Sequence, residues 1–243
     1  MKSLFAGIGL LLIGLAAAAQ STPEEIAKKE LPKKAVCVVC AANGEGHGEE
    51  RPAAGMRYKG RAYFFCSAKE AVTFKQDPEA FMPPVLPRTA PRALGAKLDG
   101  AAVTLSDFEG KVTLVDFWAT WCAPCVASMP DLQKLHDRYS DRGFSVVGVS
   151  IDEEGAKKVK PFLAKRKFSY PILLDADGKS PVWKAFGVHG VPALFLVNRN
   201  GQIVRQWTGK VNRKEVEKAV AEILEAEAAQ DIPPVRRTVR NLE

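Results

Sequence analysis

The stretch FWATWCAPC, Phe117 to Cys125, places two cysteines two residues apart, with a tryptophan before the first and a proline before the second. It overlaps a β-branched and aromatic run, Lys111 to Trp118, which predicts a buried strand. Apolar residues then recur at helical spacing from Ala123 to Tyr139. The cysteine pair is therefore predicted to lie where a strand passes into a helix.

Strands and helices continue to alternate along the rest of the chain. Residues 144–151 and 193–198 predict buried strands, and residues 202–207 follow the latter across an Asn-Gly turn, which indicates a hairpin. Val159, Phe162 and Leu163 suit a helix, and a last helix is predicted over residues 211–228. The order β-α-β-α-β-β-α predicts an α/β fold with a mixed central sheet flanked by helices.

This placement has a chemical consequence for the two cysteines. Cys122 is predicted at a helix N-terminus, where free N–H groups and the helix dipole favour a thiolate, which is the nucleophile in disulfide exchange. Cys125, one turn further, is predicted to attack Cys122 and release a captured partner. A structural disulfide or half of a metal site fits the C-x-x-C beside this β-α-β pattern less well than redox chemistry does.

The segments LVDFWATWCAPC and GVHGVPALFLVNRNGQI closely resemble the thioredoxin superfamily, and within it the exported TlpA/ResA-like thiol–disulfide oxidoreductases. The resemblance covers roughly residues 93–226. It implies a thioredoxin fold and a cis peptide bond between Val191 and Pro192, packed against the cysteine pair. It also implies that the Val191 backbone pairs with the substrate chain.

Asp116 matches the buried acid of thioredoxin, which assists proton transfer to the second cysteine. The alternative is a strand-end residue that faces solvent. Many TlpA-like proteins carry a glutamate three residues after the second cysteine, but this chain has Ser128 there, so that role is not carried over. Trp121 is predicted to wall the site, with core packing as its alternative, and His189 is predicted to contact the substrate.

The N-terminus predicts export. Lys2 precedes a twelve-residue apolar run, and Ala17-Ala18-Ala19 offer small residues for cleavage before Gln20. This is typical of a cleaved secretory signal peptide, and an uncleaved membrane anchor is the alternative. Disulfides persist outside the cytoplasm. The formal charge of +7 is interpreted as a solvated surface or a weak attraction to anionic membranes or acidic partners, and nucleic-acid binding is not expected.

A second cysteine group, Cys37, Cys40 and Cys66, lies in a glycine-rich stretch that resembles a YHS domain, related to the TRASH metal-binding modules. The resemblance implies metal binding through cysteines, with copper or zinc as candidates. A fourth ligand is not obvious; His47 is a candidate, and a solvated loop histidine is its alternative. Two alternatives stay open. Cys37 and Cys40 could form a disulfide or redox relay, or the module could be a degenerate structural unit.

The predicted organisation divides the chain at a proline-rich linker. The segments are a signal peptide (1–19), a polar N-terminal segment (20–34), a small YHS-like cysteine-containing domain (35–82), the linker (83–93), a thioredoxin-like domain (94–228) and a basic tail (229–243).

The predicted activity is that of a periplasmic or otherwise exported enzyme that reduces disulfides of envelope proteins. The resemblance implies that a membrane electron donor of the DsbD type keeps it reduced, with no cofactor in the thioredoxin-like domain. The main alternative is a metal carrier that uses that domain to dock its client. A peroxidase is a further alternative, although no P-x-x-x-T/S-x-x-C stretch is present. The oligomeric state is not predicted.

Overall fold

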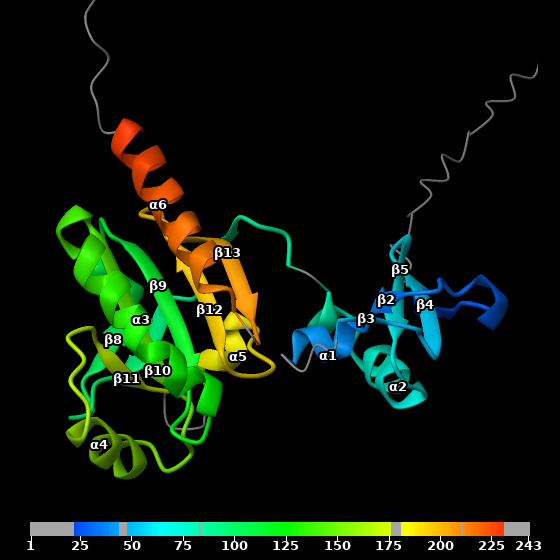
Figure 1. The fold of residues 1–243 in the computed structure, drawn as a ribbon, viewed down its shortest axis with the longest axis horizontal. Helices are drawn as coiled ribbons and strands as arrows, with labels where there is room; N and C mark the ends of the chain where they lie inside the picture. The colour runs from blue at the N-terminus through cyan, green and yellow to red at the C-terminus, as the bar shows by residue number, and fades with distance from the viewer. Residues whose placement is uncertain (1–21, 44–47, 83, 176–180, 210, 231–243) are drawn as a thin grey trace, which may run out of the picture.

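The computed structural model describes residues 22–43, 48–82, 84–175, 181–209 and 211–230. The predicted signal peptide, His47 and most of the basic tail therefore lie outside the described residues. Within the described ranges, the chain forms a small N-terminal part and a larger sheet with helices, which Figure 1 shows side by side.

Eight strands form the large sheet in the order β6-β13-β12-β9-β10-β11-β7-β8. Their bounds are Arg88–Thr89 (β6), Ala93–Ala96 (β7), Ala102–Thr104 (β8), Val112–Trp118 (β9), Phe144–Ser150 (β10), Ile172–Leu174 (β11), Ala193–Val197 (β12) and Gln202–Thr208 (β13). The central strands β9, β10 and β11 run parallel, whereas β12 is antiparallel to both β9 and β13. The predicted mixed sheet and its hairpin are confirmed. Sequence reasoning did not anticipate the two edge strands, β6 and β8, or β7, which pairs with β11 and β8.

Four helices pack on this sheet: α3 (Ala123–Tyr139), α4 (Ala156–Ala164), α5 (Val182–Phe186) and α6 (Arg213–Gln230). Alternation along β9 decides which face each side chain meets. Leu114 and Trp118 pack in the hydrophobic cluster with α3, α4 and α6, whereas Val115 and Phe117 pack in the cluster with α5. Asp116 alternates with the first set, so its carboxyl points under α3 and α6.

The N-terminal part is built around an antiparallel sheet of β1 (Glu24–Glu25), β4 (Ala54–Tyr58) and β5 (Arg61–Phe65). The strands β2 (Ala35–Val36) and β3 (Glu49–Glu50) form a second, two-stranded sheet. Two helices, α1 (Val38–Ala42) and α2 (Ala68–Gln76), and the 3₁₀ turn η2 (Glu79–Phe81) complete the N-terminal part. This part has its own hydrophobic cluster, in which Phe65 and Phe74 are fully buried. This small cluster contains two of the three N-terminal cysteines.

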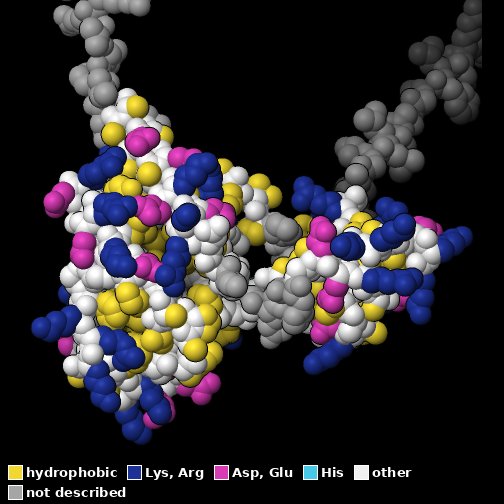
Figure 2. All heavy atoms as spheres, in the orientation of Figure 1, with side chains coloured by type: hydrophobic (Ala, Val, Ile, Leu, Met, Phe, Trp, Pro, Cys, Tyr) yellow, Lys and Arg dark blue, Asp and Glu magenta, His cyan; other side chains and the backbone are white. Residues whose placement is uncertain are grey.

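The linker is fixed to the large sheet over its second half. Strand β6 pairs with β13, and the Arg88 guanidinium donates to the carbonyl of Phe186 over 2.7 Å. Only the few residues before Arg88 therefore remain as a tether between the two parts. Figure 2 shows Lys and Arg side chains interspersed with acidic ones over both parts of the visible face, as expected for a solvated surface.

Candidate active site

Cys122 is the residue that caps the N-terminus of α3. Strand β9 ends at Trp118, a tight turn follows, and the Cys122 N–H donates to the Ala119 carbonyl over 3.1 Å. The Cys122 sulfur in turn accepts from the N–H of Cys125 over 3.3 Å. Because that N–H belongs to the first turn of a 17-residue helix, it is placed to stabilise negative charge on the sulfur when the disulfide is reduced.

The pair Cys122–Cys125 forms a disulfide, with the two Cα atoms 5.3 Å apart. Cys122 retains 5% exposure while Cys125 has none. An incoming thiolate or disulfide therefore reaches Cys122 first, and Cys125 is shielded within the helix.

Asp116 lies beneath the helix that carries the cysteines. Its side chain is 1% exposed, and neither carboxyl oxygen has a hydrogen-bond partner among the described residues. Burial without a partner disfavours the charged form and raises the pKa of Asp116 to about 7. The predicted burial is confirmed, and the solvent-facing alternative is wrong. A carboxyl with this pKa can take up or release a proton near neutral pH.

A cavity of about 520 Å³ opens beside this carboxyl, between α3 and the start of α6. Asp116, Pro124 and Pro192 all line it. The Val191–Pro192 peptide bond is cis, as the resemblance implied, and the Pro192 carbonyl accepts from the N–H of Gly209 over 2.8 Å. The cavity thus brings together the buried acid, the cysteine turn and the cis-proline loop.

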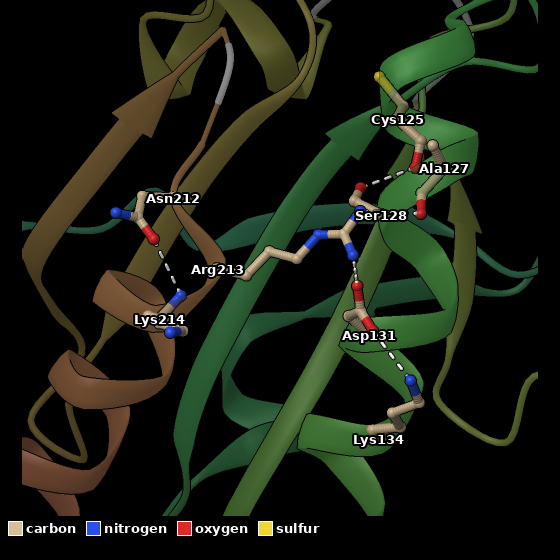
Figure 3. Close-up of polar contacts among 8 residues, drawn as sticks. All are labelled: Cys125, Ala127, Ser128, Asp131, Lys134, Asn212, Arg213 and Lys214. Atoms are coloured by element: carbon tan, nitrogen blue, oxygen red, sulfur yellow. Dashed lines mark hydrogen bonds and ion pairs between the residues drawn. The ribbon is translucent and has the colours of Figure 1, made fainter.

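Polar residues of α3 and α6 also line this cavity, and Figure 3 shows the Arg213 side chain reaching from the start of α6 to α3. Arg213, at the start of α6, forms an ion pair with Asp131 and donates to the Ala127 carbonyl over 3.3 Å. Ser128, at the position where related proteins carry glutamate, donates its hydroxyl to the Cys125 carbonyl over 2.7 Å. Ser128 therefore satisfies a backbone carbonyl on α3, and Asp116 is the buried acid among the described residues that line this cavity.

Sequence reasoning missed Asp152, which holds the active-site turn in place. Its carboxylate accepts from the Thr120 N–H over 2.9 Å and from the Thr120 hydroxyl over 2.6 Å. The Ser150 hydroxyl donates to the same carboxylate over 2.7 Å. Asp152 is 8% exposed and lies two residues after the end of β10. An acid at the end of a buried strand beside the cysteine strand was the available signal.

Trp121 and His189 take different positions around the site. The Trp121 side chain is 68% exposed immediately before Cys122, so it stands on the surface and does not pack in the core. The His189 ring stacks on Phe81 of the N-terminal part, with ring centroids 5.5 Å apart. The core-packing alternative for Trp121 is therefore wrong, and His189 has a partner within the chain.

The three N-terminal cysteines converge from α1 and from the end of β5. Cys37 caps α1, Cys40 lies inside α1, and Cys66 follows β5. Their sulfur atoms all lie within 4.8 Å of one another, and those of Cys40 and Cys66 are 3.4 Å apart. All three are free thiols, so the disulfide considered between Cys37 and Cys40 is not formed in this structure.

The three thiols of the cluster differ in the direction in which their surroundings shift the pKa. Burial opposes ionisation of Cys37, but hydrogen bonds from Cys40 and Cys66 outweigh it and lower the pKa of the Cys37 thiol. Burial and the neighbouring thiols raise the pKa of Cys40, and burial raises the pKa of Cys66. Within the described ranges, the cluster contains these three ligands, and the predicted fourth, His47, lies outside them.

Comparison with known proteins places this geometry in context. The Redoxin family model matches residues 81–223. The thiol–disulfide oxidoreductase ResA of Halalkalibacterium halodurans is 32% identical over 131 residues, which cover 54% of this chain and 72% of that protein. ResA of Bacillus thuringiensis is 29% identical over 136 residues, which cover 56% and 77% of the two chains.

Solved structures of thiol–disulfide exchange proteins are also similar to this chain. A thiol:disulfide interchange protein from Bacteroides sp. matches with a TM-score of 0.52 and 29% identity, covering 59% of this chain and 93% of that one. The thioredoxin domain of a thiol–disulfide oxidoreductase from Bacteroides vulgatus matches with a TM-score of 0.50 and 31% identity, covering 57% and 99%. The predicted thioredoxin fold is confirmed.

Proposed function

Because the chain belongs to the Redoxin family and is a thiol–disulfide oxidoreductase, we propose that its Cys122–Cys125 couple reduces disulfides of proteins outside the cytoplasm. The observation that carries the proposal is a disulfide at the start of α3 with a buried, unpartnered Asp116 beside the same cavity. The names of the relatives support the chemistry. The predicted signal peptide supports export, and in the part of the chain that the structure describes no helix is long and apolar enough to cross a bilayer.

In the reductive direction, the Cys122 thiolate attacks one sulfur of the client disulfide and forms a mixed disulfide, while the other client sulfur leaves as a thiolate. Asp116 then accepts the Cys125 proton, and the Cys125 thiolate attacks Cys122. The client leaves as a dithiol, and the couple becomes the disulfide seen here. The cis-proline loop positions the client, with the Val191 backbone as its pairing edge. A membrane electron donor of the DsbD type restores the dithiol.

We also propose that the cysteine module, residues 35–82, binds a soft metal ion such as copper or zinc. Three thiols within 4.8 Å of one another, two of them buried, fit such an ion, and Cys37 ionises most readily. When bound, the metal would draw on Cys37, Cys40 and Cys66 as ligands. This cluster also favours a second candidate function, a metal carrier that docks clients through its thioredoxin-like domain.

Insulin reduction separates the two functions. Cys122→Ser is expected to abolish insulin turnover. Cys37→Ser is expected to retain it, because Cys37 lies in the N-terminal part and not at the Cys122–Cys125 couple. Absence of turnover in the wild type, together with stoichiometric copper binding, would favour the carrier. The midpoint potential of the Cys122–Cys125 couple then sets the direction of exchange.

A further inference from the structure

The cysteine module sits against the loop that leads into the cis-proline. The carbonyl oxygen of Asn43, at the end of α1, lies where a side chain on Gly190 would be, 2.2 Å from an ideal Cβ position. Phe81 stacks on His189 in the same loop. Glycine at 190 is therefore required for this close approach, which is made by the helix that carries Cys40.

A cavity of about 600 Å³ lies between the module and the large sheet. Helix α1 and η2 line it from one side, and α5, His189 and Thr208 line it from the other. The module thus lies against the edge that, under the proposed function, receives clients. The tether from Met82 to Arg88 is only a few residues long, because β6 is paired with β13.

Two thiols of the three-cysteine cluster, Cys40 and Cys66, lie close enough to form a disulfide. The sulfurs of Cys40 and Cys66 are 3.4 Å apart, so side-chain rotation brings them towards the bonding distance of about 2.05 Å. Cys66 is the most exposed of the three. Outside the cytoplasm such thiols oxidise unless a reductant maintains them, and their oxidation would remove two metal ligands.

We propose that the module is a substrate of the enzyme's own Cys122–Cys125 couple, an inference that rests on the proposed function. The Cys122 thiolate attacks Cys66 of a Cys40–Cys66 disulfide, and Cys40 leaves as a thiolate. Cys125 then attacks Cys122, which releases Cys66. Two electrons pass from the couple to the module, and an external dithiol reduces the couple again. The chain thereby keeps its own metal-binding thiols reduced.

The test follows the module disulfide in the full-length chain. Cys37→Ser leaves Cys40 and Cys66 as the module's pair, and diamide oxidises it. Dithiothreitol is then added in limiting amount, and alkylation with mass mapping measures thiol recovery. With Cys122 intact, recovery is expected to be at least about tenfold faster than with Cys122→Ser, because a short tether gives an effective concentration on the order of millimolar. The rate is also expected to be independent of protein concentration.

Two further variants keep the test decisive. In the chain with Cys125→Ser and the native Cys37, mapping is expected to find a disulfide between Cys122 and Cys66 within one monomer. Phe81→Ala is expected to slow module reduction while insulin turnover is retained. If the module thiols recover equally fast with Cys122 intact and with Cys122→Ser, while wild-type insulin turnover is normal, this inference is refuted and the proposed function stands. If the wild-type protein does not reduce insulin, the proposed function is refuted.

Discussion

Replacing Asp116 with asparagine tests the electrostatics of the site most directly. Its pKa is raised from 3.8 to about 7 by burial, which corresponds to about 4 kcal/mol at about 1.4 kcal/mol per tenfold change in ionisation. Between these two pH values the folded protein holds a proton that the unfolded chain releases. The contribution to stability is therefore complete below pH 3.8 and is lost as pH rises through about 7.

The measurement is urea unfolding of the oxidised protein from pH 4 to pH 8, followed by tryptophan fluorescence. All four tryptophans lie after residue 94, so the signal reports the large sheet. Wild type is expected to lose up to about 4 kcal/mol relative to Asp116→Asn over this range. Asp141→Asn, at an exposed acid, serves as the matched control and should follow the wild-type curve. Parallel pH curves for wild type and Asp116→Asn would refute the argument.

Three further outcomes are expected. Cys125→Ser should accumulate a mixed disulfide between Cys122 and an added client, seen on non-reducing gels, and rapid release of the client would contradict the assigned order of attack. Asp152→Ala should lower the free energy of unfolding by about 1–3 kcal/mol, because the Thr120 turn loses its acceptor. Cys66→Ser should lower zinc affinity at least about tenfold in a competition titration, whereas Cys122→Ser should not.

Local sequence patterns were sufficient to predict the main strands and helices of the fold. The β-branched and aromatic run of β9 and the helical spacing of α3 are patterns that span only a few residues, so the strand, the cysteine turn and the helix could be predicted. The short strands β6, β7 and β8 could not, since they are two to four residues long and form only where the large sheet offers an edge. The 3₁₀ turns and α5 are similarly short.

The sequence by itself determined the chemistry at Cys122 and Cys125, because a cysteine at a strand–helix junction meets the helix N-terminus whatever the rest of the chain does. Only the tertiary structure decided that Asp116 lacks a partner, that Asp152 reaches the Thr120 turn, and that Cys66 joins Cys37 and Cys40. These contacts join residues up to 32 positions apart. Their distances depend on how strands pair and helices pack, which no local pattern encodes.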